Sequence, residues 1–237
     1  MMIAAAVALE PATEPSIEPQ LRQHGWAPLG RLLNPEQCQQ LINLFDQPQH
    51  FRRHIRMEQF RFGRGEYQYF ADPLPELVAQ LRTQLYAPLA APASRWMADL
   101  GLPEEYPPTL NEFLARCHQA GQTRPTPLLL RYQEGDYNCL HQDLYGSVVF
   151  PFQVVIGLNA PGRDFEGGEL LLTEQRPRAQ SMGQVIPLGQ GEAVVITTRY
   201  RPVPSQRGFY RANVRHGVSP LRAGLRHTLG LIFHDAQ

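Results

Sequence analysis

The chain has 237 residues, in which 22 basic and 22 acidic side chains cancel to a formal net charge of zero. A neutral chain of this length holds one sizeable core and is not drawn as a whole to nucleic acid or to a membrane. None of the basic residues is lysine. This excludes Schiff-base catalysis and a lysine P-loop, and it leaves arginine to bind any anion.

The N-terminal segment, residues 1–18, is apolar over its first nine residues and then acidic and proline-rich. We expect a mobile tail, because the segment lacks a basic start and is too short to span a bilayer. No other segment is long and apolar enough to cross a membrane, so no membrane partner is expected. The three cysteines, Cys38, Cys117 and Cys139, are far apart and odd in number. They predict reduced thiols in a cytoplasmic protein.

Residues 19–125 are predicted to form a helical support region. Asn34 and Pro35 make a helix start signal, and apolar residues follow at helical spacing. The same spacing predicts two further helices, so that the three cover residues 34–45, 74–89 and 109–120. Between the first two, residues 50–70 are rich in arginine and aromatic residues and are predicted to be extended.

The sequence pattern changes from helical spacing to β-rich runs at about residue 126, and residues 126–237 are predicted to form a series of short strands. The β-rich runs are broken by Gly, Pro or Asp turns, and no helical pattern lies between them. They cover residues 127–133, 137–143, 151–159, 168–174, 183–188, 192–198, 214–221 and 226–235. This pattern predicts a mainly β protein with N-terminal helices, in which a jelly-roll core is buttressed by helices within one integrated domain.

The stretch "NCLHQDLYG", residues 138–146, places a histidine and an aspartate two positions apart. Residues i and i+2 of a strand share a face, so His141 and Asp143 would point the same way and could be adjacent metal ligands. The alternative is a surface strand that carries a hydrogen-bonded His-Asp pair. Such triplets often arise by chance, and this one alone does not decide between the two.

A later strand offers His216, and ten residues further on Arg226 and Thr228 share a strand face. A guanidinium beside a hydroxyl could bind a small dicarboxylate. Two histidines and one carboxylate form the facial triad of non-haem iron(II) oxygenases. The combination of His-x-Asp, a distant histidine and Arg-x-Thr is far more specific than any of its parts.

The region from about Leu128 to Ala236 resembles the iron(II)- and 2-oxoglutarate-dependent dioxygenases, which have a double-stranded β-helix (jelly-roll) core. The segments "RYQEGDYNCLHQDLYG", "DFEGGELLLTEQRPR" and "RHGVSPLRAGLRHTLGLIFHDA" resemble a bacterial group described as DNA-repair-type oxygenases. The region is also similar to prolyl hydroxylases, in which a tyrosine precedes the His-x-Asp and a Gly-Gly-x-Leu turn opens the next strand.

The resemblance implies that His141, Asp143 and His216 hold Fe(II). It further implies that Arg226, Thr228 and Tyr132 bind the cosubstrate 2-oxoglutarate, and that O₂ is the oxidant. Repair-type enzymes place an asparagine two residues before that tyrosine, where this chain has Leu130. This departure favours the prolyl-hydroxylase style of cosubstrate binding.

Three functions stay open at this point. One is oxidative demethylation of a damaged base in single-stranded or unstacked nucleic acid. Another is hydroxylation of a protein or peptide, for example at proline. The third is a non-catalytic jelly-roll binding module, against which the intact triad and Arg226 argue.

Two arginine clusters bear on the substrate. The first lies within residues 52–64, with Glu58 as its one acid, and the second lies within residues 199–215 and has no acid. The second runs up to His216 and is either a solvated loop or a basic rim around the iron pocket. In the rim interpretation the substrate residues are Arg201, Arg207, Phe209, Tyr210 and Arg211, with the aromatic pair stacking on a base.

Five further residues, of three types, are not expected to act as metal or phosphate ligands. His227 alternates to the face opposite Arg226 and is expected to be a packed or surface histidine, whereas His234 shares the parity of Arg226 and is a minor candidate for the far end of the pocket. Cys139 is expected in the core. Gly167 and Gly168 are expected to serve a turn and not phosphate binding, because no helix follows them.

Overall fold

The computed structural model describes residues 17–102 and 104–237. The α-helices in this part of the chain are α1 (Ile17–His24), α2 (Pro35–Leu44), α3 (Glu76–Asp99) and α4 (Leu110–Gln119), and the 3₁₀ helices are η1 (Pro48–His50) and η2 (Met57–Phe60). The strands are β1 (Trp26–Arg31), β2 (Phe51–Arg56), β3 (Gly63–Arg64), β4 (Glu66–Phe70), β5 (Leu128–Gln133), β6 (Tyr137–His141), β7 (Phe152–Gly157), β8 (Phe165–Gly167), β9 (Leu170–Gln175), β10 (Met182–Ile186), β11 (Glu192–Thr197), β12 (Tyr200–Ser205), β13 (Gly208–Val218) and β14 (Leu221–Ile232).

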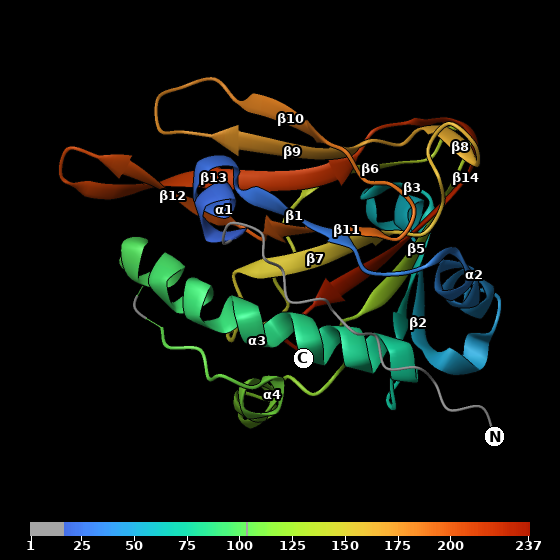
Figure 1. The fold of residues 1–237 in the computed structure, drawn as a ribbon, viewed down its shortest axis with the longest axis horizontal. Coiled ribbons are helices and arrows are strands. Elements are labelled where there is room, and N and C mark those ends of the chain that lie inside the picture. Colours follow the sequence, from blue (N-terminus) through green and yellow to red (C-terminus); the bar gives the residue numbers. More distant parts are fainter. Residues whose placement is uncertain (1–16, 103) are drawn as a thin grey trace.

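The strands form two antiparallel sheets that lie one above the other (Figure 1). The larger has the order β1-β11-β7-β14-β5-β4-β2, with β8 beside β14, and the smaller has the order β10-β9-β13-β6-β3, with β12 beside β13. Leu172 and Val214 of the smaller sheet share a buried cluster with Val194 and Ile196 of the larger. The prediction of a mainly β jelly roll with helical support is confirmed.

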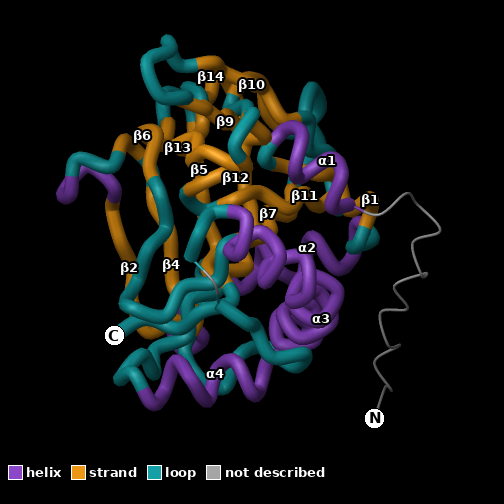
Figure 2. The backbone as a smooth tube through the Cα atoms, turned by 90° about the vertical axis from the view of Figure 1, so that its left-hand side faces the viewer, coloured by secondary structure: helices purple, strands orange, loops and turns teal. Residues whose placement is uncertain are grey.

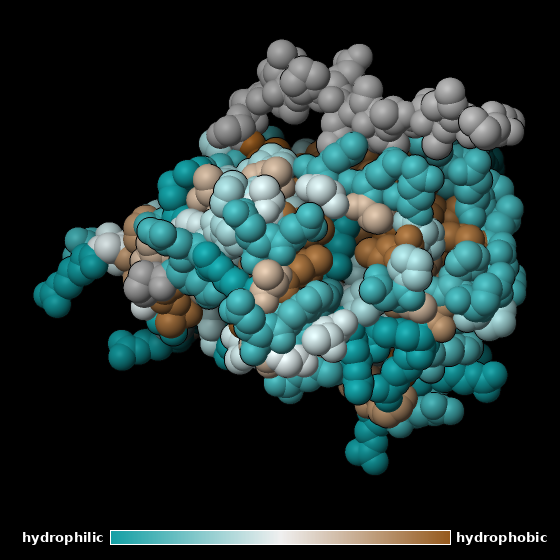
Figure 3. Space-filling model, turned by 90° about the horizontal axis from the view of Figure 1, so that it is seen from below, coloured by the Kyte–Doolittle hydropathy of each residue, from teal (hydrophilic) through white to brown (hydrophobic). Residues whose placement is uncertain are grey.

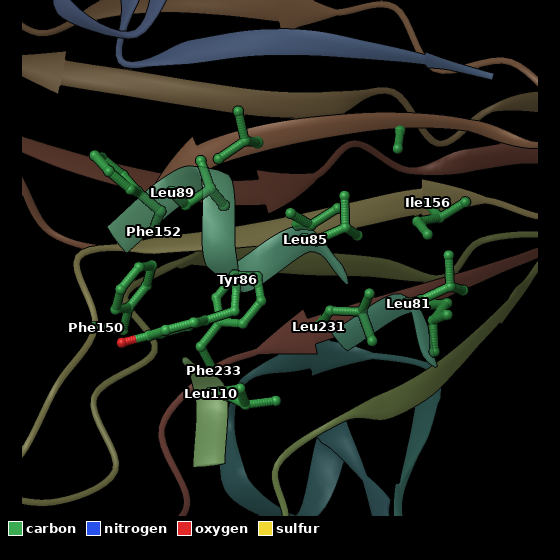
Figure 4. Close-up of a cluster of buried hydrophobic side chains, with 14 of the residues drawn as sticks. Leu81, Leu85, Tyr86, Leu89, Leu110, Phe150, Phe152, Ile156, Leu231 and Phe233 are labelled. Atoms are coloured by element: carbon green, nitrogen blue, oxygen red, sulfur yellow. The ribbon is translucent and has the colours of Figure 1, made fainter. Parts of the chain in front are cut away.

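Helices α3 and α4 lie on the side of the larger sheet away from the smaller one (Figure 1), whereas α1 contacts β1, β11 and β12. Leu81, Leu85 and Leu89 of α3 point at β7 and β14, where Ile156 and Leu231 meet them (Figure 4). Viewed from below, the surface is mostly hydrophilic with separate hydrophobic patches (Figure 3). No helix in the described residues has the length and apolar character needed to cross a bilayer.

Helix starts follow the sequence signals. Asn34 forms a capping box with Gln37 at the start of α2, and Thr109 forms one with Glu112 at the start of α4. Helix α3 ends at Asp99, well past the predicted end at residue 89, although it contains Pro88 and Pro92. Burial of its later turns, including Trp96, outweighs the local preference to stop at a proline.

The N-terminal half contributes strands as well as helices. The extended segment over residues 50–70 is confirmed as β2, β3 and β4, and β4 pairs with β5 of the second half. Strand β1, which was not predicted, pairs with β11. Both halves therefore build the same sheet. Residues 1–16 of the expected tail lie outside the described residues, and Ile17 and Glu18 begin α1.

The loop expected over residues 199–215 is instead a β-hairpin of β12 and β13. Pro202 and Pro204 hid the first strand, since proline cannot donate a backbone hydrogen bond. Strand β12 pairs only with β13 in the described structure, so it is an edge strand and tolerates both prolines.

Candidate active site

The two histidines of the site face each other across neighbouring strands. His141 on β6 and His216 on β13 are direct cross-strand partners, and their ring centroids are 4.3 Å apart. The register shifts immediately after His216. A side chain at Gly217 would place its Cβ 2.7 Å from the carbonyl oxygen of Asn138, so only glycine allows the two strands to approach here.

Asp143 completes a compact cluster. Its Oδ2 lies 3.2 Å from Nε2 of His216, and its Oδ1 lies 3.6 Å from Nε2 of His141. One ligand atom from each of the three residues lies within 4.8 Å of the others. Strand β6 ends at His141, so Asp143 reaches the site from the segment that follows it and not from a regular strand.

The protonation states suit a metal centre. Nδ1 of His141 is 2.8 Å from the carbonyl oxygen of Cys139, so this nitrogen carries the proton and Nε2 is free to act as a ligand. Burial lowers the pKa of His141, and the nearby His216 lowers it further. Burial alone would raise the pKa of Asp143, but both histidines and the hydroxyl of Tyr145 bring it well below its ordinary value.

The cluster opens into a cavity of about 200 Å³ that Tyr132, Arg226 and Thr228 also line. Arg226 and Tyr132 are cross-strand partners on β14 and β5, and Thr228 shares the face of Arg226 two residues further on. All three are buried. The structure thus brings the predicted metal ligands and the predicted cosubstrate residues into one space.

Arg226 is a buried cation with an unsatisfied donor. Its side chain is 3% exposed, and its Nη1 has no hydrogen-bond partner among the described residues. The guanidinium carbon lies 5.5 Å from the ring centroid of Tyr132 and 5.9 Å from that of Phe165. Burial lowers the pKa of Arg226. An unpaired buried charge is costly, so this arrangement calls for an anionic ligand.

The glycine pair next to Arg226 has the turn role expected of it. Gly167 and Gly168 have φ angles of +76° and +61°, which disfavour other residues. A Cβ on Gly168 would lie 2.5 Å from Leu221 and 3.0 Å from Cδ of Arg226. The turn therefore leaves room for the Arg226 side chain.

Sequence reasoning missed three polar residues that line the cavity. Asn138 donates to the Tyr132 hydroxyl at 3.4 Å, Tyr145 donates to Asp143 at 2.7 Å, and Nε2 of Gln153 lies 3.3 Å from Nε2 of His216. Tyr145 could have been found from its position two residues after Asp143. Gln153 stands in an apolar run and carries no local signal.

The residues of the predicted basic rim do not line the cavity. Arg201 is 3% exposed and donates to Glu174 at 2.8 Å, so it belongs to a buried ion pair. The remaining predicted substrate residues lie on the β12–β13 hairpin, which projects away from the rest of the smaller sheet (Figure 1), and none lines the cavity: Arg207, Phe209, Tyr210 and Arg211. The eight residue-to-residue steps from Gly208 to His216 span about 27 Å along the strand.

Three other expectations are resolved by the structure. His227 packs against Phe45, with ring centroids 5.8 Å apart, as expected. His234 does not line the cavity, because β14 ends at Ile232 and the histidine is wholly buried beyond it. Cys139 is exposed and not in the core, because β6 lies between β13 and the two-residue strand β3, which covers little of it.

A cluster of two histidines and an aspartate inside a jelly roll is an arrangement typical of non-haem iron oxygenases. Comparison with known proteins agrees with this class. Residues 65–236 match the family Oxygenase-NA, described as "oxygenase, catalysing oxidative methylation of damaged DNA". The chain belongs to this family, and the predicted oxygenase assignment is confirmed.

The chain is similar in sequence to two mycobacterial proteins and in fold to a prolyl-4-hydroxylase. Two uncharacterised proteins of Mycobacterium tuberculosis, from strains CDC 1551 and H37Rv, are each 52% identical over 167 residues, covering 70% of this chain and 72% of theirs. A prolyl-4-hydroxylase of Pseudomonas putida has a similar fold, with a TM-score of 0.55 and 14% identity over 93% of this chain and 97% of that one. At this identity the likeness concerns the fold alone.

Proposed function

We propose that this oxygenase uses Fe(II), held by His141, Asp143 and His216, and the cosubstrate 2-oxoglutarate. One observation carries the proposal: the unpaired buried guanidinium of Arg226 shares a cavity with a cluster of three metal-binding side chains. The first feature requires an anion and the second suits a metal. A small dicarboxylate whose other end is an oxo acid can satisfy both at once.

The residues present fit an iron centre. Two imidazoles and one carboxylate supply three ligands and leave further coordination positions for small molecules. When bound, Fe(II) supplies the activation of O₂, which no protein side chain can provide. The protein's part is to hold His141 in the ligand tautomer through the Cys139 carbonyl and to keep Asp143 ionised.

The cosubstrate would lie along the floor of the cavity. Arg226 would bind the distal carboxylate of 2-oxoglutarate, and the Thr228 hydroxyl would donate to the same group. The Tyr132 hydroxyl, which accepts from Asn138, is free to donate its own proton to a carboxylate oxygen. Repair-type enzymes have an asparagine at the position of Leu130. In this chain Asn138, on β6, is the asparagine that contacts the tyrosine.

The reaction conserves all atoms: 2-oxoglutarate, O₂ and a substrate C–H bond give succinate, CO₂ and a C–OH group. For a methylated base the product is a hydroxymethyl group, which leaves as formaldehyde and restores the N–H. Damaged DNA as the substrate class is supported by the family description. The target base must be unstacked or single-stranded to reach a buried centre. The three cysteines are free, which supports the cytoplasm as the compartment.

Succinate and formaldehyde release from purified, Fe(II)-loaded protein tests the proposal. An N-methylated single-stranded oligonucleotide should stimulate succinate release and yield formaldehyde in equal amount. His141→Ala should abolish both products, whereas His118→Ala, at a histidine outside the cavity, should not. Stimulation by a proline-containing peptide pool and not by the oligonucleotide would instead identify a protein hydroxylase.

A further inference from the structure

A second cavity, of about 400 Å³, adjoins the candidate active site. Phe62, Tyr67 and Tyr145 line both cavities. Tyr145 also donates to Asp143, so the second cavity reaches the side chains that surround the metal site. We call it the arginine groove, after the three arginines that line it and not the first cavity: Arg52, Arg53 and Arg124. Phe60, Phe62 and Tyr69 also line it.

The three arginines converge from distant parts of the chain. Strand β2 has an irregularity between Phe51 and Arg53 in its pairing with β4. Such a bulge interrupts the alternation of side chains, which is how both Arg52 and Arg53 line the same groove. Arg124 joins them from a bridge with Ala236, next to the chain end, which lies beside β2 (Figure 2).

Positive charge predominates among the residues that line the groove, which include three arginines and the last residue, Gln237. No Asp or Glu side chain is among the described residues that line it. Within the described chain neither Arg53 nor Arg124 forms an ion pair, and both are exposed. Arg52 is held in place, since its Nε donates to the Pro125 carbonyl at 2.9 Å and its guanidinium stacks 4.7 Å above the Tyr69 ring. Burial lowers the pKa of Arg52, and so do Arg124 and Arg53.

The groove also has an exposed aromatic surface. Phe60 and Phe62 stack on each other, with centroids 5.6 Å apart and planes 20° from parallel. They are 44% and 46% exposed, which is unusual for large apolar side chains. Phe62 also lines the active-site cavity, so this pair stands where one cavity opens into the other.

We propose that the arginine groove binds single-stranded nucleic acid, with Arg52, Arg53 and Arg124 on successive phosphates and Phe60 and Phe62 stacked against a base at the entrance of the active-site cavity. Positive charge along a backbone track, beside exposed aromatic rings, is how proteins hold single strands without reading sequence. The inference rests on the proposed function and assigns its substrate contacts. An acidic peptide would use the arginines but gain nothing from stacking.

Binding of a short unmodified single-stranded oligonucleotide to the metal-free protein, followed by fluorescence anisotropy at two salt concentrations, tests the groove. Three phosphate contacts predict a slope of log K against log salt of about −2, hence binding about 15-fold weaker when salt rises fourfold. Arg53→Gln and Arg124→Gln should each reduce the slope by about 0.7. Arg207→Gln, on the β12–β13 hairpin, is the matched control and should leave the slope unchanged.

Stacking is tested separately. Phe60→Ala should weaken binding by about 5- to 150-fold with an unchanged slope, and Phe60→Trp should preserve affinity. Equal slopes for the wild type and both groove arginine variants, or tighter binding of an acidic peptide than of the oligonucleotide, would overturn the proposal. Because these measurements need neither iron nor 2-oxoglutarate, a wild type that binds the oligonucleotide but releases no succinate refutes the proposed function and not the groove.

Discussion

The Tyr145 hydroxyl donates a hydrogen bond of 2.7 Å to Oδ1 of Asp143. The same hydroxyl lies 3.1 Å from that of Tyr69, so a chain of two tyrosines leads from the arginine groove to the proposed iron ligand. This bond helps to lower the pKa of Asp143 and orients the carboxylate toward the two histidines.

Tyr145→Phe should therefore weaken Fe(II) binding by about 10- to 100-fold, the usual effect of losing a partner that orients a metal ligand. Anaerobic Fe(II) titration measures the change. Tyr69→Phe is the matched control, because it removes a hydroxyl that contacts Tyr145 and not Asp143, and it should have a smaller effect. Equal affinities for Tyr145→Phe and the wild type would contradict the orienting role.

Asp143→Asn should abolish Fe(II) binding and succinate release while the protein stays folded. The amide keeps the size of the side chain but loses the charge that a divalent cation requires. Circular dichroism should show an unchanged fold, since the cluster lines a cavity. Wild-type succinate release by this variant would show that the metal ligands are misassigned.

Arg226→Met should make the ligand-free protein more stable by about 1–3 kcal/mol, because it removes a buried donor that has no partner. Urea unfolding without ligand measures this gain. Excess 2-oxoglutarate at about 100 times its Kd should stabilise the metal-loaded wild type by about 2.7 kcal/mol and leave the variant unchanged. A variant that is less stable than the wild type without ligand would mean that the guanidinium is satisfied in some other way.

Acid should destabilise the protein through His227. Burial lowers its pKa from 6.5 to about 4. Between these values the unfolded state binds more protons than the folded state, so the free energy of unfolding falls as pH drops from about 6.5 to 4. His227→Gln should remove this pH dependence. Lowering the pH from 7 to 4.5 should therefore reduce the free energy of unfolding of the wild type by about 2 kcal/mol more than that of the variant. Parallel pH profiles in urea unfolding would count against the buried neutral state.

Arg201 should prove to be structural. Arg201→Ala leaves Glu174 buried with a weaker set of partners and should cost about 3–5 kcal/mol in unfolding free energy. Arg207→Ala, on the same hairpin, should change stability by less than about 0.5 kcal/mol. Oligonucleotide affinity of the folded fraction should be unaffected in both. Reduced affinity in Arg207→Ala would restore the hairpin as a substrate surface.

Residues at short, regular spacing were predictable from the sequence. Arg226 and Thr228 obey the two-residue period of a strand, whereas His141 and Asp143 share the site although β6 ends at His141. The combination of both pairs with His216 indicated the class of chemistry. What brings the pairs together is long-range strand pairing, such as the register of His141 with His216, and a single sequence does not specify that register.

Features that depend on irregular backbone or on distant segments were missed or wrong. The prolines of β12 disguised an edge strand, so buried Arg201 was mistaken for a surface residue. The arginine groove needs a shifted register at Arg53 and the return of the chain end to Arg124. Its arginines were visible in the sequence, but their convergence beside the active site was not.

The central claim is that one cavity binds both the metal and 2-oxoglutarate, with Arg226 as the carboxylate anchor. Anaerobic calorimetric titration of 2-oxoglutarate into Fe(II)-loaded protein tests it most directly, with Arg222→Gln on the same strand as the matched control. The account predicts one 2-oxoglutarate per chain for wild type and Arg222→Gln, and for Arg226→Gln an affinity about 30- to 4,000-fold lower with iron still bound. Undiminished 2-oxoglutarate binding by Arg226→Gln, or none by the wild type, would contradict it.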